Sequence, residues 1–183
     1  MNNRVKKYLL EVARIAICER LGVNFKVSEK NDDPILKEKR GVFVTLTLDG
    51  KLRGCIGNIT PVYTLVDAVK NNAVSAGFED PRFDPLSVDE IDKIKIEISA
   101  LSIPKKLEYK NPDDLLEILR PNIDGVIIEK GWYKATYLPQ VWEELKDEEM
   151  FLGSLCEKAG MNFDEWEKGL CEVSTYQVEA FGE

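Results

Sequence analysis

The sequence contains no histidine among its 183 residues. This absence excludes Ser-His-Asp and Cys-His catalytic arrangements, and it removes the commonest metal ligand in proteins. The four cysteines, Cys18, Cys55, Cys156 and Cys171, lie far apart and form no Cys-x-x-Cys pair. Neither a zinc motif nor a disulfide framework is therefore expected, although four scattered thiols could still meet in space. We predict no metal and no cofactor.

Long apolar runs are also missing. No run reaches the ~18 residues that a membrane-spanning helix needs. Residues 1–16 have basic side chains before an apolar stretch, as a signal peptide would, but Glu11 and Arg14 interrupt that stretch with helical spacing. No small-residue cleavage site precedes Cys18. We therefore predict an amphipathic helix at residues 5–21 of a cytoplasmic protein that does not contact a membrane.

Positive charge is in deficit. The chain has 25 basic and 33 acidic residues and a formal net charge of -8. Such a molecule repels nucleic acid as a whole, so binding would need a local basic patch. The candidate patches at 6–7, 37–40 and 105–106 are short and are more often solvated edges than phosphate sites. This argues against nucleic acid as a partner.

The order of the predicted elements indicates the fold class. At 183 residues and 44% hydrophobic content, the chain can bury a core and has the length of one domain. Helical patterns alternate with two hairpins, and hairpins imply antiparallel pairing, so we predict an α+β fold with antiparallel sheets and packed helices. The two hairpins suggest two lobes, 1–102 and 111–183, joined by a linker at about 103–110.

Local patterns predict the boundaries of four further elements. A second helix is expected to be capped by Thr60, with Pro61 at its first position, and to end at Gly77. Residues 93–101 alternate strictly and predict a strand. The second hairpin is expected to turn at Lys130-Gly131, and residues 170–181 are expected to form one last strand.

The strongest local pattern lies at residues 41–58. Alternation over 42–48 predicts a strand, Asp49-Gly50 predicts a two-residue turn, and 51–57 is the return strand. The register implied by this turn pairs Leu48 with Lys51, Leu46 with Arg53, and Val44 with Cys55. Gly54 would then lie on the other face, where a glycine often marks a bulge or a close approach by another backbone.

Arg53 and Cys55 are thus predicted on one face, two residues apart. A guanidinium near a thiol favours the thiolate, which is the nucleophilic form. The alternative is that Cys55 is a small buried hydrophobe and Arg53 a surface charge or ion-pair partner. The nearby Gly54 and Gly57 leave the backbone accessible. Both interpretations stay open.

Two further segments carry candidate polar groups. The loop 78–86 contains Asp80 and Arg82, and a local ion pair that braces the loop is favoured over an anion-binding role for Arg82. Glu97 and Ser99 share the polar face of the strand at 93–101. They would be site residues if that face lined a cleft, although such a face is more often simply solvated.

The hexapeptide at 52–57, LRGCIG, resembles the signature of the AMMECR domain family (AMME syndrome chromosomal region candidate gene family). Further segments resemble the family in the same order: 41–46, 80–83 (DPRF), 97–101 (EISAL), 124–127 (DGVI), 138–142 (LPQVW) and 151–160 (FLGSLCEKAG). The resemblance runs from about residue 5 to the C-terminus, so the chain is expected to be a single stand-alone domain, 1–183. It implies an α+β fold with two lobes and a cleft between them.

The resemblance implies no established activity, since the family's biochemistry is unassigned. Prokaryotic relatives occur beside, or fused to, a Memo-like protein and a radical S-adenosylmethionine enzyme, which implies a shared modification reaction. The first hypothesis is accordingly an enzyme or enzyme component, with Cys55 as nucleophile or covalent attachment point in the cleft and Arg53 stabilising its thiolate. Without histidine, a carboxylate or water would transfer protons. The candidate substrate-binding or proton-transfer residues are Asp80, Arg82, Glu97, Ser99, Gln140 and Trp142.

The second hypothesis is a non-catalytic binding or adaptor module. The hexapeptide would then shape a recognition surface, and Trp142 and Tyr137 would supply anchors of the kind that interfaces favour. The competing interpretation for Trp132 and Trp142 is core packing, which we favour because aromatic residues dominate core energetics. Nucleic-acid binding is the third hypothesis, and the net charge disfavours it.

Overall fold

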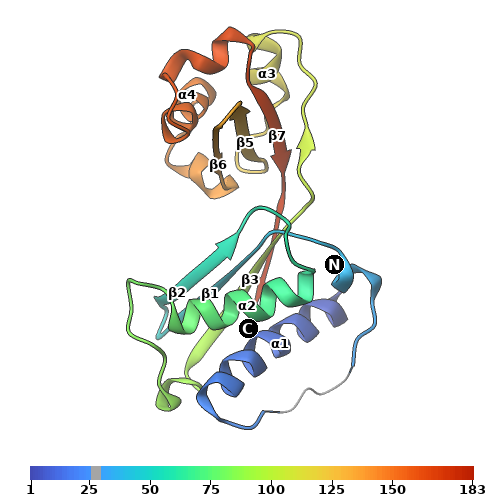
Figure 1. Ribbon diagram of the computed structural model, residues 1–183, viewed down its shortest axis with the longest axis vertical. Coiled ribbons are helices and arrows are strands. Elements are labelled where there is room, and N and C mark those ends of the chain that lie inside the picture. The colour runs from blue at the N-terminus through green and yellow to red at the C-terminus, as the bar shows by residue number, and fades with distance from the viewer. Residues whose placement is uncertain (26–29) are drawn as a thin grey trace. The chain divides into compact units, whose positions relative to one another are not determined.

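The computed structural model describes residues 1–25 and 30–183 (Figure 1). It divides into two compact units: residues 1–101 together with 179–183, and residues 102–178. The chain therefore passes between the units twice. After the second passage, residues 179–183 belong to the first unit. The sequence prediction placed these residues in the lobe 111–183. The predicted cleft between lobes stays a prediction.

The first unit is an antiparallel sheet with helices on one face. Its strand order is β2-β1-β3-β8, and β1 pairs antiparallel with both of its neighbours. The helices α1 and α2 lie side by side along one face (Figure 1), and their apolar side chains form one core with the inward residues of the sheet. The bounds are α1 Asn3–Leu21, β1 Val42–Leu48, β2 Lys51–Asn58, α2 Leu65–Phe78, β3 Ile94–Leu101 and β8 Val178–Gly182, with short 3-10 helices at Pro34–Lys37 and Val88–Glu90.

The second unit is also a sheet with helices. Its strand order is β4-β7-β5-β6, with antiparallel pairing throughout. Trp142 and Phe151 stack at the centre of its core, with ring centroids 3.5 Å apart. The bounds are β4 Lys105–Lys106, α3 Pro112–Ile118, β5 Gly125–Lys130, β6 Tyr133–Tyr137, α4 Glu148–Lys158 and β7 Glu172–Tyr176, with 3-10 helices at Pro139–Glu143 and Phe163–Lys168. Together the two units confirm the predicted α+β class. Across the described residues, no helix is long and apolar enough to cross a membrane.

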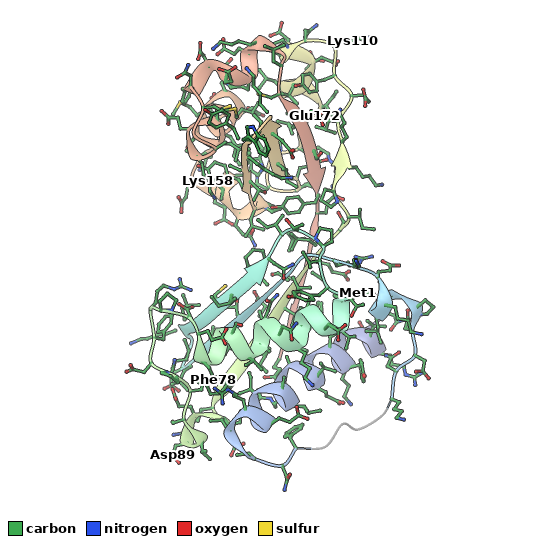
Figure 2. The ribbon with its side chains drawn as sticks, in the orientation of Figure 1. Met1, Phe78, Asp89, Lys110, Lys158 and Glu172 are labelled. Carbon is green, nitrogen blue, oxygen red and sulfur yellow. The ribbon has the colours of Figure 1, made fainter. Side chains whose placement is uncertain are left out.

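The helix boundaries follow local capping. The first helix ends as predicted, because Gly22 adopts the left-handed conformation (φ 72°). The predicted cap of the second helix at Thr60 is wrong. Its cap is Thr64, whose side chain accepts a hydrogen bond from the backbone of Asp67. Thr64 is itself held in an extended bridge to Lys39, so the helix cannot start earlier. Phe78, labelled in Figure 2, is the last residue of α2.

Two strand predictions need correction. The predicted last strand at 170–181 is two strands, β7 and β8, which belong to different sheets on either side of Gln177. Alternation continues through such a crossing, so the sequence pattern cannot reveal it. In the second hairpin Lys130 pairs with Tyr133, so the turn residues are Gly131 and Trp132, one position later than predicted. The positive φ of Gly131 (59°) fits the first turn position. The side chain of Trp132 is 100% exposed at this turn, so the core packing expected for it is wrong.

The predicted register of the first hairpin is also wrong beyond its turn, and this changes the face of the sheet on which Cys55 lies. Leu48 pairs with Lys51 as predicted, but a β-bulge at Arg53 then shifts the return strand, so that Leu46 faces Gly54 and Thr45 faces Cys55. The predicted pairing of Cys55 with Val44 is therefore wrong. A one-residue shift exchanges the two faces of a strand. Cys55 consequently lies on the face away from the helices, and Gly54 lies under α2.

Position 54 has room only for glycine. A Cβ built on it would lie 2.0 Å from the carbonyl oxygen of Ala76 in α2, which is a severe steric clash. Because this oxygen belongs to the backbone of the helix, it cannot move aside. The close approach of helix to strand thus depends on the missing side chain.

We expect Gly54→Ala to lower the free energy of unfolding by about 2–3 kcal/mol, because the added methyl group overpacks a fixed backbone contact. Urea unfolding followed by circular dichroism measures the change. Leu52→Ala, on the same strand but with Leu52 44% exposed, is the control and should change stability far less. Equal stabilities for the two variants would contradict the proposed contact between α2 and Gly54.

Candidate functional site

The candidate site lies on the outer face of the first sheet, opposite its helices. Thr45 on β1 is flanked by Cys55 on β2 and by Glu97 on β3, so the three residues form a row across the sheet. The Thr45 hydroxyl donates a hydrogen bond to the Cys55 sulfur, with Oγ1 and Sγ 3.3 Å apart. The row therefore places a thiol, a hydroxyl and a carboxylate on one surface.

Cys55 differs from the other cysteines in its exposure. All four lie within the described residues, all four are free thiols, and only Cys55 is not buried. Burial raises the pKa of Cys156 to about 11 and also raises the pKa values of Cys18 and Cys171. Those three thiols are thus held in the protonated, unreactive form, and Cys55 is the one that reagents can reach.

The backbone of Cys55 is held by an ion pair from the loop after α2. Its N–H donates to the Asp80 carboxylate at 2.9 Å, and its carbonyl oxygen accepts from Arg82 at 3.3 Å. Arg82 donates three hydrogen bonds to the Asp80 carboxylate, two from its guanidinium at 2.9 and 2.7 Å and one from its backbone N–H at 3.1 Å. Since β2 is an edge strand, this pair occupies the place that a neighbouring strand would take. We call it the edge clamp.

The two residues of the edge clamp differ strongly in their exposure to solvent. The Asp80 carboxylate is buried, whereas Arg82 is about half exposed. The side-chain hydrogen bond from Arg82, with help from the Cys55 backbone, holds the pKa of Asp80 far below its usual range. Asp80 is therefore ionised at neutral pH and keeps Arg82 in place. The predicted ion pair is present, and an anion-binding role for Arg82 stays a prediction.

Arg53 has a different partner from the one that its sequence position suggested. Its guanidinium donates to the Glu90 carboxylate at 2.7 and 3.2 Å. Glu90 also accepts hydrogen bonds from the backbone and hydroxyl of Ser87, which forms a capping box at the 3-10 helix Val88–Glu90. Within the described residues the Nη1 atom of Arg53 has no hydrogen-bond partner. The guanidinium that contacts Cys55 directly is that of Arg82.

The remaining predicted residues divide between the two units. Glu97 is exposed, and Ser99 is half-buried and pairs with Phe43, which in turn faces Gly57. A Cβ on Gly57 would lie 2.3 Å from the Phe43 ring, so this second glycine of the hexapeptide makes room for an aromatic side chain.

Gln140 and Trp142 belong to the second unit. Gln140 is exposed, whereas Trp142 is 1% exposed and donates from its indole nitrogen to the carbonyl oxygen of Asp124 at 2.8 Å. Core packing, the interpretation favoured for Trp142, is confirmed. Tyr137 is half-buried and hydrogen-bonds to Ser154.

Sequence reasoning missed Thr45 and the second role of Glu90. The alternation of β1 already placed Thr45 on the polar face, but the wrong register gave Cys55 a different neighbour. Nothing in the local sequence pattern connects Glu90 to Arg53, 37 residues earlier. In the described part of the chain, no group of three or more Cys, Asp or Glu side chains is arranged to hold a metal ion.

Comparison with known proteins identifies the family. The AMMECR1 family model matches residues 10–181, and the chain belongs to this family. A protein of Methanothermobacter thermautotrophicus is 41% identical over 177 residues, covering 96% of this chain and 92% of that protein. Protein MK0488 of Methanopyrus kandleri is 42% identical, covering 97% and 87%. The crystal structure of the uncharacterized protein PH0010 from Pyrococcus horikoshii superposes with a TM-score of 0.78 at 38% identity, covering 100% of this chain and 93% of that one.

The Arg53–Glu90 pair predicts a pH dependence of stability. The hydrogen bonds from Arg53, then those from Ser87, lower the pKa of Glu90 from 4.5 to about 2. A carboxylate whose pKa is lower in the folded chain stabilises it above the unfolded value, and this contribution is lost as the pH falls through the folded value. We expect Glu90→Gln to reduce the unfolding free energy by about 1–3 kcal/mol at pH 7, with the difference shrinking between about pH 4.5 and pH 2.

Urea unfolding at a series of pH values checks this expectation. Glu167→Gln, at an exposed position of the 3-10 helix Phe163–Lys168, is the matched control. A difference between wild type and Glu90→Gln that stays constant from pH 7 to pH 2 would show that the ionised carboxylate does not stabilise the fold.

Proposed function

We propose that this chain is an enzyme, or a component of one, that uses the Cys55 thiol as a nucleophile or covalent attachment point. The observation that carries the proposal is that Cys55 is the one cysteine left accessible, on a polar sheet face, while the other three are buried. Its backbone is fixed by the edge clamp, so the thiol is presented in one position. A fixed position is what a reacting group needs.

The surrounding groups hold Cys55 in this proposal. The Thr45 hydroxyl donates a hydrogen bond to the sulfur. Arg82 adds positive charge through its contact with the Cys55 carbonyl. Arg53, which the sequence suggested for this role, would instead stabilise the bulge by binding Glu90.

Proton transfer would fall to Glu97 or to water. Asp80 is committed to Arg82 and to the Cys55 backbone, so it is poorly placed to accept a further proton. Glu97 is exposed and lies one strand beyond Thr45 on the same face. Ser99 and Gln140 remain candidates for contacts with the substrate.

The proposal includes partners that the family resemblance implies. Prokaryotic relatives occur beside a Memo-like protein and a radical S-adenosylmethionine enzyme, so this chain would contribute the thiol to a reaction that they share. The sequence contains no Cys-x-x-Cys pair and no histidine, and a role alongside a cofactor-bearing enzyme agrees with that composition.

One observation favours the alternative of a non-catalytic adaptor. Both glycines of the hexapeptide have architectural reasons: Gly54 admits Ala76 of α2, and Gly57 admits the Phe43 ring. The motif could thus serve to shape a surface around Phe43 and Cys55. Trp142 cannot anchor such a surface, because it is buried in the core of the second unit. The net charge of -8 continues to disfavour nucleic acid as the partner.

Thiol labelling distinguishes an activated Cys55 from an architectural one. With iodoacetamide at pH 7 and peptide mapping, we expect Cys55 to react at least about tenfold faster than the other three cysteines, because they are buried and protonated. Thr45→Val and Arg82→Met should each slow the labelling of Cys55 by about three- to tenfold, since each removes a contact that holds this residue in position.

The second unit offers a matched control. Arg120 and Asp124 form a pair with the same guanidinium–carboxylate hydrogen bonds and nearly the same exposures as Arg82 and Asp80, and among the described residues neither of them hydrogen-bonds to a cysteine. Arg120→Met should therefore leave the labelling rate of Cys55 unchanged. If Cys55 reacts no faster than Cys18, Cys156 and Cys171, the proposed nucleophile is wrong.

A further inference from the structure

The aromatic ring of Phe83 lies within reach of two arginine side chains. The Cζ atom of Arg82 is 5.5 Å from the centre of the ring, and the Cζ atom of Arg53 is 6.0 Å from it. Both distances fall in the range in which a guanidinium is attracted by the electron-rich face of an aromatic ring. The same ring thus lies beside one arginine of the edge clamp and one of the Arg53–Glu90 pair.

Phe83 does not belong to the apolar core. As far as the chain is described, the core of the first unit contains residues of the helices, the sheet and their connections, and Phe83 is not one of them. Its side chain is half-buried. What the ring contributes is therefore to be sought in its contacts with the two guanidinium groups.

The backbone around Phe83 is held from both sides. The N–H of Phe83 donates to the carbonyl oxygen of Asp80 at 3.1 Å, which closes a turn. Three residues later Leu86 is buried in the apolar core. Arg53 also reaches this loop, with its Nη2 atom 3.5 Å from the carbonyl oxygen of Pro85. The ring is thus carried by a fixed segment, which is what a side chain needs if it is to position another group.

Arg82 can contact the ring and keep its hydrogen bonds. Its Nε and Nη2 atoms bind the Asp80 carboxylate, and Nη2 also binds the Cys55 carbonyl oxygen. Hydrogen bonds use the edge of the planar guanidinium group, so its faces remain available to an aromatic ring. A half-exposed arginine loses side-chain freedom when it is held in one place, and contact with a fixed ring offsets part of this cost.

Arg53 gains from the same ring in a different way. Its guanidinium is largely buried, and among the described residues its Nη1 atom has no hydrogen-bond partner. A buried N–H group without a partner costs free energy. The Phe83 ring offsets part of this cost, because its face attracts the positive charge of the whole guanidinium group.

We propose that Phe83 is a positioning residue for Cys55: its ring holds the Arg82 guanidinium in the edge clamp, and the clamp in turn fixes the Cys55 peptide. Phe83 acts through Arg82, which is the residue that binds the Cys55 carbonyl oxygen. The contact with Arg53 connects the same ring to the bulge of β2. The consequence for reactions at the thiol rests on the proposed function, whereas the effect on the Cys55 backbone does not.

Amide hydrogen exchange, followed by NMR, measures the clamp without involving the thiol. The N–H of Cys55 is bound by the Asp80 carboxylate, so it exchanges when the clamp opens. Phe83→Leu keeps an apolar side chain but removes the aromatic face, and it should accelerate this exchange by about two- to fivefold, the effect of one exposed cation–π contact. Phe83→Tyr keeps an aromatic face and should exchange at the wild-type rate.

Two further variants make the test specific. Phe181→Leu is the matched control, because Phe181 is also half-buried and lies 5.8 Å from the Lys6 ammonium group, but on β8, at the opposite edge of the sheet from β2. It should leave the exchange of the Cys55 amide unchanged. Pentafluorophenylalanine at position 83 keeps the shape of the ring and reverses its polarity, so it should accelerate the exchange at least as much as Phe83→Leu. The fluorinated chain decides the test by itself if urea unfolding shows that Phe83→Leu destabilises the whole chain.

A double-mutant cycle tests whether the ring acts through Arg82. Phe83→Leu should accelerate the exchange in the wild-type chain but add nothing in a chain that already carries Arg82→Met. Equal acceleration in both backgrounds would overturn the proposal. So would wild-type exchange in Phe83→Leu and in the fluorinated chain, or a Phe83→Tyr variant that exchanges as fast as Phe83→Leu.

Iodoacetamide labelling at pH 7 extends the test to the thiol. Under the proposed function, Phe83→Leu should slow the labelling of Cys55 by about two- to fivefold, because the clamp that holds this residue opens more often. The two proposals can fail separately. A Cys55 that reacts no faster than the other three cysteines contradicts the proposed nucleophile, while the amide exchange still decides the role of Phe83.

Discussion

The contact between the Ala76 carbonyl group and the bare α-carbon of Gly54 determines the geometry of the first sheet. Because α2 approaches the strand so closely, the residue beneath it must lack a side chain, and the bulge at Arg53 is what brings Gly54 to that position. Without the bulge, Cys55 would occupy the helix-covered face opposite Val44, among the buried apolar residues. The exposure of the thiol, its contact with Thr45 and its place in a row with Glu97 all depend on this one extra residue.

Two arginine–carboxylate pairs then stabilise the bulged strand, and their different exposures imply different roles. Arg53 is largely buried, and it connects the bulge to Glu90, the last residue of the 3-10 helix Val88–Glu90. Arg82 is half exposed over a buried Asp80, and it closes the edge of the sheet at the Cys55 peptide. The equivalent pair in the second unit, Arg120 with Asp124, shows that this geometry also occurs as plain architecture. What distinguishes the Asp80–Arg82 pair is therefore the residue whose backbone it holds.

The sequence predicted the fold class, most elements and the presence of the first hairpin, because these follow from local periodicity, caps and turn residues. It failed where a tertiary contact overrides the local pattern. The register beyond Leu48 depends on α2, and the start of that helix depends on the bridge between Lys39 and Thr64. The break between β7 and β8 depends on a crossing from one sheet to another. The candidate site behaved in the same way: Cys55 is a candidate because of its motif, but its neighbours Thr45 and Arg82 come from the register and from a loop 27 residues later.

The chemistry open to Cys55 follows from what surrounds it. A cysteine beside histidine gains a base that takes its proton, and this chain has no histidine. Here the sulfur has instead a hydroxyl donor, the Cys55 carbonyl oxygen has a guanidinium donor, and a carboxylate lies on the same face of the sheet, on β3. Donors stabilise a thiolate once it has formed, but they do not remove its proton. Under the proposed function, Cys55 would therefore serve as an attachment point or as a nucleophile towards an incoming electrophile, and repeated acid–base cycles would need a base from elsewhere.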